Sequence, residues 1–152
     1  MPHSESTTTA PAYPRTGLLR RLGALFYDTL VLLALWMLGT ALTLLFTGGQ
    51  AVPPGNPVYQ TFLLILSFAY FGGFWHRGGQ TVGMKAWRLR VRTRGGRGLT
   101  WTHALLRFFG AIGSWLVIGL GFSWSLFDRE GLAWHDRFSD TELVVLPKPD
   151  QA

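Results

Sequence analysis

Two charged residues near the N-terminus could form a chemical site because of their types and their spacing. The stretch RRLGALFYDTLVLLALWMLGTALTLLF, residues 20–46, is almost wholly apolar after its two arginines, yet it contains Asp28. Arg21 precedes Asp28 by seven residues, almost two turns of an α-helix, so both lie on one face about 10 Å apart along the axis. Charged groups inside membrane helices almost always face a protein interior or a wet cavity. Asp28 is therefore a candidate site for a cation, a proton or a cationic ligand. A structural pairing with a basic group of another segment, and a neutral, protonated carboxyl, are the open alternatives.

Near the C-terminus, LAWHDRFSDTELVV places His135, Asp136 and Arg137 side by side. A metal site needs three or four ligands within reach, and His76 and His103 stand in no recognised ligand spacing. A catalytic triad needs a nucleophile oriented by a base, and no residue marks one. The expected role of the three residues is to anchor the C-terminal segment against a basic loop. We predict no metal, no cofactor and no enzymatic activity.

The loop RGGQTVGMK superficially resembles a phosphate-binding loop, whose pattern is G-x-x-x-x-G-K-[ST]. Counting from Gly78, Gly83 is in place, but Met84 stands where the lysine is required and Ala86 follows Lys85 where Ser or Thr is required. The loop also follows an apolar segment and not a strand. We therefore expect no nucleotide site, and expect the glycines to permit a sharp exit from the membrane.

The segments that must position these residues are long and apolar. Residues 22–46, 58–75 and 103–127 are apolar blocks whose formal charges are Asp28 and Arg107 alone. A helix that spans a bilayer needs about 20 mostly apolar residues, and the 14% of charged residues in the chain is well below the about 25% of soluble domains. The sequence predicts an all-α integral membrane fold with about three apolar helical segments. The third block either spans or bends back, and its first part, with His103 and Arg107, suits the membrane interface.

Between the second and third blocks lies a basic loop without any acidic residue. It contains Arg77, Lys85, Arg88, Arg90, Arg92, Arg94 and Arg97. Cytoplasmic loops carry an excess of Lys and Arg, so the loop and the arginine-bearing N-terminus are expected in the cytoplasm, and the uncharged connector 47–57 outside. Basic segments next to a membrane also attract anionic lipid headgroups. Because topology explains the charge, nucleic acid is not an expected partner.

Within this loop, WRLRVRT alternates apolar and basic residues, which is the period of a β-strand. The C-terminal run TELVVL is also strand-like. We predict that the two runs pair, which requires both to lie on the cytoplasmic side. Residues 1–19 are expected to be a disordered tail, residues 20–146 the membrane domain and residues 147–152 a short C-terminal tail.

The segments RRLGALFYD, GQTVGMKAWRLRV, ALLRF and DREGLAWHDRFSDTELVV resemble, in this order, those of the RDD family of small bacterial membrane proteins. The resemblance covers residues 13–146, and by it Arg21, Asp28 and Asp136 correspond to the arginine and the two aspartates that name the family. Asp140 is an extra acid where the family often has AGT.

The resemblance implies a multi-pass protein of the bacterial inner membrane that transports an ion or small ligand through a buried Arg/Asp site. The alternative is a non-transporting subunit that supports another membrane protein. A homo-oligomer or a second membrane protein is the expected partner.

Overall fold

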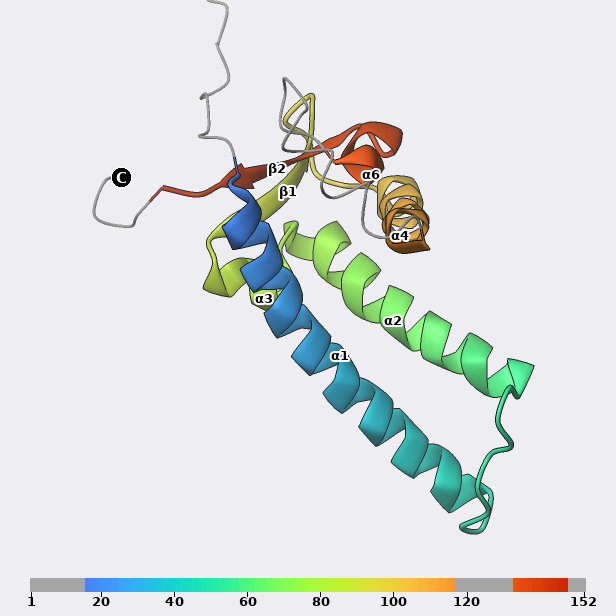
Figure 1. Cartoon of the computed structure of the whole chain (residues 1–152). Coiled ribbons are helices and arrows are strands. Elements are labelled where there is room, and N and C mark those ends of the chain that lie inside the picture. The colour runs from blue at the N-terminus through green and yellow to red at the C-terminus, as the bar shows by residue number, and fades with distance from the viewer. Residues whose placement is uncertain (1–15, 117–132, 148–152) are drawn as a thin grey trace, which may run out of the picture.

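The computed structural model describes residues 16–116 and 133–147. These residues form a mostly helical structure with one two-stranded sheet (Figure 1). Of the expected tails only residues 16–19 and 147 are described, and residues 117–127 of the expected third block lie outside the described residues. The elements in chain order are α1 (Leu18–Phe46), α2 (Pro57–Gly78), α3 (Val82–Ala86), β1 (Leu89–Thr93), α4 (Trp101–Leu116), α6 (Trp134–Phe138) and β2 (Thr141–Val145).

Helices α1 and α2 lie side by side as a long hairpin, and the other elements gather where α1 begins and α2 ends (Figure 1). Both helices are long and apolar enough to cross a membrane. The start of α2 is set by Asn56, whose side-chain oxygen accepts hydrogen bonds from the backbone N–H groups of Val58 and Tyr59, and by Pro57 at the first helical position. The end of α2 is set by Gly79, which has a left-handed backbone with φ of 68°. The first two apolar blocks are thus helical, as predicted.

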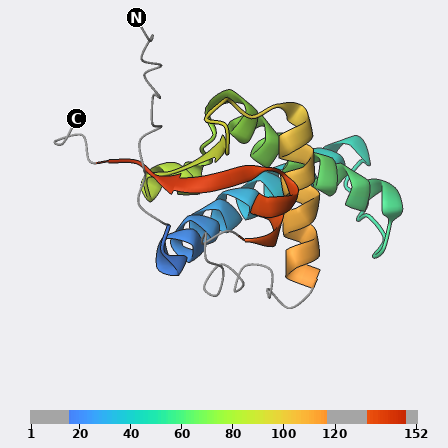
Figure 2. The same cartoon turned by 90° about the horizontal axis from the view of Figure 1, so that it is seen from above.

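Helix α4 runs across this hairpin. It is seen along its axis in Figure 1, where α1 and α2 are seen lengthwise, and it is seen lengthwise in Figure 2. Ala104 and Phe108 are buried against the core, whereas Leu105 and Phe109 are exposed. This helical spacing gives α4 one inner and one outer apolar face. The described part of the third block, residues 103–116, therefore belongs to a 16-residue helix that lies transverse to the other two.

The predicted pairing of the two strand-like runs is confirmed. β1 and β2 are antiparallel, with Arg90 opposite Val144 in the register. Because side chains alternate along a strand, Leu89 and Val91 point to the core and are almost fully buried, while Arg90 and Arg92 take the other face. The core that β1 covers consists of Ala24, Trp75, Met84, Leu89, Val91, Leu99, Ala104, Phe108 and Val145.

The GQTVGMK segment folds as a helix end followed by the short helix α3. Thr81 caps α3 by accepting a hydrogen bond from the backbone N–H of Met84 at 3.2 Å. Gly83 presses α3 directly against α1, since a Cβ atom at this position would lie 2.1 Å from the carbonyl oxygen of Ala24. The two structural glycines of this segment, Gly79 and Gly83, therefore serve a helix end and a close helix–helix approach.

The register gives a first testable prediction. The chain contains no cysteine, so a variant with cysteines at Arg90 and Val144 carries only this thiol pair, and its Cβ atoms face each other across the strands. We expect rapid disulfide formation under mild oxidation, measured by mass spectrometry. The control pair at Arg90 and Leu143 puts the thiols on opposite faces and should stay reduced. Equal oxidation of the two pairs would contradict the register.

Candidate functional site

The carboxylate of Asp136 joins three helices that are far apart in the sequence. Asp136 is fully buried. Its Oδ2 accepts from Arg21 Nη1 of α1 at 3.1 Å, and its Oδ1 accepts from Arg107 Nη1 of α4. The backbone N–H of Ala133, just before α6, donates to Oδ2 at 3.0 Å. Both oxygens of this carboxylate are therefore engaged by donors from α1, α4 and the start of α6.

Arg107 is held by further contacts on its own side of the carboxylate. Its Nη1 also donates to Thr141 Oγ1 at 3.0 Å, and its guanidinium carbon lies 5.2 Å from the ring centroid of Trp75, within the range of a cation–π contact. The Thr141 hydroxyl is within 2.7 Å of the Ser139 hydroxyl. The arginine is thereby fixed between β2, α2 and α6.

The electrostatics of this cluster are set by two buried arginines around one carboxylate. Burial by itself raises the pKa of the Asp136 carboxyl, but the guanidinium groups of Arg107 and Arg21 outweigh it and hold this pKa well below its usual range. Burial lowers the pKa of His135 to about 3, so its imidazole is neutral at neutral pH. The 3.6 Å approach of His135 Nε2 to Asp136 Oδ1 is therefore no ion pair. Two cations thus share a single anion.

Asp28 lies in a separate set of contacts, and all its partners are neutral. Its side chain is 3% exposed, which confirms the prediction that it faces the protein interior. Oδ1 accepts from the Tyr70 hydroxyl at 2.7 Å and from the Gly83 backbone N–H at 2.8 Å, and Oδ2 accepts from the Thr81 hydroxyl at 2.5 Å. Within the described part of the chain, no basic group lies within ion-pairing distance of Asp28. A carrier role for Asp28 stays a prediction.

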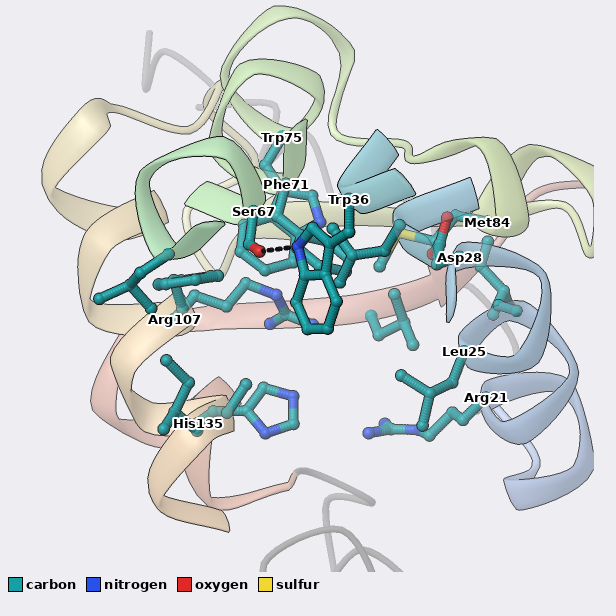
Figure 3. Close-up of a pocket in the computed structure, with 18 residues that line it drawn as sticks. Arg21, Leu25, Asp28, Trp36, Ser67, Phe71, Trp75, Met84, Arg107 and His135 are labelled. Carbon is teal, nitrogen blue, oxygen red and sulfur yellow. Dashed lines mark hydrogen bonds between the residues drawn. The ribbon is translucent and has the colours of Figure 1, made fainter. Parts of the chain in front are cut away.

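Arg21 and Asp28 nevertheless line one common cavity, with a volume of about 290 Å³. It lies between α1, α2 and α4, and Figure 3 shows Arg21, Arg107 and His135 around one end of it and Asp28 near Met84. Trp36 forms part of the cavity wall and donates its indole N–H to the Ser67 hydroxyl at 3.0 Å. The remaining lining is apolar, from Ala24, Leu25, Leu32, Leu64, Phe71, Trp75, Met84, Leu89, Phe108, Ala111, Ile112 and Leu143.

Two buried donors on this lining have no protein acceptor among the described residues. They are the indole Nε1 of Trp75 and the Nε of Arg107. Buried polar groups are normally hydrogen-bonded, so each such exception calls for a partner. A ligand with acceptor oxygens in the cavity would supply one.

The structure thus brings together two of the three residues singled out in the sequence, Arg21 and Asp136, and places Asp28 on another part of the same cavity. Sequence reasoning missed the role of Arg107. Its signal was present, because Arg107 is the only formal charge in the block 103–127, just as Asp28 is in 22–46. Among the described residues no group of three or more His, Asp or Glu could hold a metal ion.

The basic loop does not form one surface. Arg92 pairs with Glu142 at 2.6 Å across the strands, and the Lys85 ammonium lies 5.8 Å from the Phe74 ring. Arg88 has a left-handed backbone, with φ of 54°, and Arg94 is exposed in the turn after β1. The other three, Arg77, Arg90 and Arg97, line a second cavity together with Arg92.

Comparison with known proteins identifies one family. The model of the RDD family matches residues 15–140, a range that includes Arg21, Asp28, Arg107 and Asp136. Comparison with curated proteins and with solved structures yields no match.

The two buried aspartates should differ in what they contribute to stability. Asp136→Asn removes the carboxylate that pairs with both buried guanidinium groups, and breaking a buried pair in this way costs about 3–5 kcal/mol. Asp28→Asn disturbs only hydrogen bonds from uncharged donors, at a cost of about 1–3 kcal/mol. The exposed Asp140 provides a matched control, Asp140→Asn, with an expected change within about 0.5 kcal/mol.

The measurement is the thermal unfolding midpoint of the purified protein in detergent. We expect the order Asp140→Asn, Asp28→Asn, Asp136→Asn from the smallest loss to the largest. An Asp136→Asn variant as stable as the control would contradict the role assigned to this carboxylate.

The buried imidazole predicts a pH dependence. The unfolded chain protonates His135 near pH 6.5, but the folded chain does so only near pH 3, so the unfolded state binds more protons between these values. Stability should therefore fall with falling pH from 6.5 towards 3, by at most about 1.4 kcal/mol per pH unit. Unfolding midpoints measured between pH 6.5 and 4 should decline less steeply in His135→Gln, whereas His103→Gln should retain the original slope. The same slope in all three proteins would argue against a neutral buried His135.

Proposed function

The chain belongs to the RDD family, and on that premise we propose that it is an integral membrane protein that binds a small amphipathic anion as the binding step of transport. The observation that carries the proposal is the cavity between α1, α2 and α4. It combines an apolar lining with two buried arginines that share one carboxylate. Ligand sites are typically concave and mostly apolar, with a few convergent polar groups.

The hairpin of α1 and α2 is the part that we place across the bilayer. Its 22-residue helix α2 is about 33 Å long, close to the roughly 30 Å of a hydrocarbon core. Exposed apolar side chains such as Leu33, Met37 and Ile65 then face lipid. The excess of basic residues near the start of α1 and the end of α2 supports a cytoplasmic location of these ends, and of the N-terminus, in a bacterial inner-membrane protein.

The first turns of α1 project beyond the bilayer in this arrangement. With 29 residues, α1 is about 43 Å long, roughly 13 Å more than a hydrocarbon core. Asp28 is the eleventh residue of α1, about 15 Å from its start, so it lies at the cytoplasmic boundary and not at mid-span. The transverse helix α4 lies along this boundary, with Leu105 and Phe109 towards the lipid.

The chemistry of the cavity favours an anion with an apolar body. The guanidinium groups of Arg21 and Arg107 both line the cavity, and burial in a low-dielectric site strengthens the attraction of a guanidinium group for an anion. The unpartnered donors of Trp75 and Arg107 are suited to acceptor oxygens of a carboxylate, sulfonate or phosphate. The volume of about 290 Å³ restricts the ligand to a small molecule.

The two candidate spanning helices of residues 16–116 do not by themselves enclose a passage across a bilayer. We therefore propose that copies of the chain, or the chain and another membrane protein, assemble around the cavity. A protein that binds the anion but moves none would instead be a subunit that supports a transporting partner.

The test uses a phenyl-diazirine sulfonate, a small aromatic anion that attaches covalently to its site on illumination, and its neutral sulfonamide. The full-length protein is labelled in lipid nanodiscs and the adducts are mapped by mass spectrometry. We expect the sulfonate to label cavity residues such as Leu64 and Ile112 about tenfold more than the sulfonamide does, which corresponds to about 1.4 kcal/mol.

Matched variants separate the cavity from general partitioning into lipid. Ala111→Phe fills the cavity and should abolish the preferential labelling, while Ala34→Phe adds the same ring at an exposed position of α1 and should not. Equal labelling by sulfonate and sulfonamide would contradict anion binding. Uptake of the sulfonate in the dark by protein-containing vesicles, lost in Ala111→Phe, would support transport, and binding without uptake would favour the supporting subunit.

A further inference from the structure

A second cavity, of about 300 Å³, lies where the end of α2 meets β1. The end of α2 forms one wall, β1 forms another, and the turn that leads to α4 forms the third. Trp75 lines both cavities, and side chains alternate along β1. Leu89 contributes to the apolar cavity and Arg90 to this one. The lining residues are Trp75, His76, Arg77, Gly78, Gly79, Arg90, Val91, Arg92, Gly96, Arg97, Gly98, Leu99, Val144 and Leu146.

This second cavity is strongly basic. Arg77, Arg90 and Arg97 come from three different segments, and no acidic residue lines the cavity. Among the described residues, none of these three arginines has a carboxylate within ion-pairing distance. The fourth lining arginine, Arg92, is neutralised by Glu142 at 2.6 Å. Three unit positive charges therefore face one space, well above the half-unit negative charge of the C-terminal end of α2.

Backbone contacts shape this cavity, and the side chains of Arg77, Arg90 and Arg97 are exposed on it. Arg90 Nε donates to the Gly78 carbonyl at 3.0 Å, which fixes the arginine stem across the end of α2. Gly79 lets the two backbones meet, since a Cβ atom there would lie 2.3 Å from the Val91 carbonyl oxygen. His76 is held on the other side by stacking on Trp101, with ring centroids 4.7 Å apart.

We propose that this basic cavity is a binding site for a phosphate group. Guanidinium groups bind phosphate through paired, charge-assisted hydrogen bonds, and three arginines that converge from α2, β1 and the turn offer donors from three sides. The site lies at the cytoplasmic end of α2 and beside the first residue of α4. In the membrane arrangement proposed above, this is the level of the lipid headgroups. The phosphate group could therefore belong either to a phospholipid or to a soluble phosphate.

The alternative is a solvated basic face that only sets the topology. The affinity of such a face for anions would depend on the number of its charges and not on their positions. Lys85 and Arg94 belong to the same loop and are exposed, but neither lines the cavity. They provide the matched control: Arg90→Gln with Arg97→Gln removes two charges from the cavity, and Lys85→Gln with Arg94→Gln removes two charges beside it.

The experiment uses the full-length protein in detergent. Phosphatidic acid adducts are counted by native mass spectrometry against phosphatidylcholine, and inorganic phosphate is titrated by calorimetry with lipid-free protein. We expect one preferential site, with affinity reduced about tenfold or more in the cavity double variant and changed less than about twofold in the control double variant. Arg77→Gln, a single change in α2, is a second cavity variant that leaves the β1 contact with Gly78 intact.

Each outcome decides the proposal. Phosphatidic acid binding that is lost in the cavity variants and is not displaced by inorganic phosphate supports a lipid headgroup site. Phosphate binding that is lost in the same variants, and that displaces the lipid, supports a soluble ligand. No preferential binding of either probe, or an equal loss in the cavity and control double variants, overturns the proposal.

Discussion

The pairing of one buried carboxylate with two buried guanidinium groups is the constraint on which the described structure depends. Asp136 joins α6 to α1 through Arg21 and to α4 through Arg107, so the transverse helix and the C-terminal strand are both positioned by it. Isolated buried charges are strongly disfavoured, and only well-placed hydrogen bonds make such a cluster tolerable. Because the three groups are separated by up to 115 positions in the chain, the cluster forms only when all three elements have docked.

A second network, in which every donor is uncharged, completes the attachment of the short helix α3. Asp28 accepts hydrogen bonds from the Tyr70 hydroxyl of α2, from the Thr81 hydroxyl and from the backbone N–H of Gly83. These donors satisfy the carboxylate without an opposite charge, which explains how an acid is accommodated inside an otherwise apolar helix. The two aspartates thus have different tasks, since one organises charges around a cavity and the other holds α3 against α1.

Local patterns predicted local structure well. The apolar blocks predicted α1 and α2, and the alternation in WRLRVRT predicted β1 and its pairing with the C-terminal run. Contacts between distant segments were harder to predict. Seven-residue spacing put Arg21 and Asp28 on one helix face, but whether each binds the other, a distant acid or a neutral hydroxyl depends on how the elements pack. Arg107 was overlooked because a charge at a helix surface and a charge in a buried cluster look alike in one sequence.

The division of β1 into an apolar and a basic face has a consequence for how the chain reaches its native state. A strand that pairs one residue out of alignment turns every side chain to the opposite side of the sheet, so here a misaligned β1 would thrust Arg90 and Arg92 into the apolar cavity. The backbone of Gly79 and the side chain of Gln80 bond to Val91 and Leu89, which fixes the alignment from the edge away from β2. Misaligned pairings of β1 with β2 are thus energetically penalised, because they would bury the two basic side chains among apolar ones.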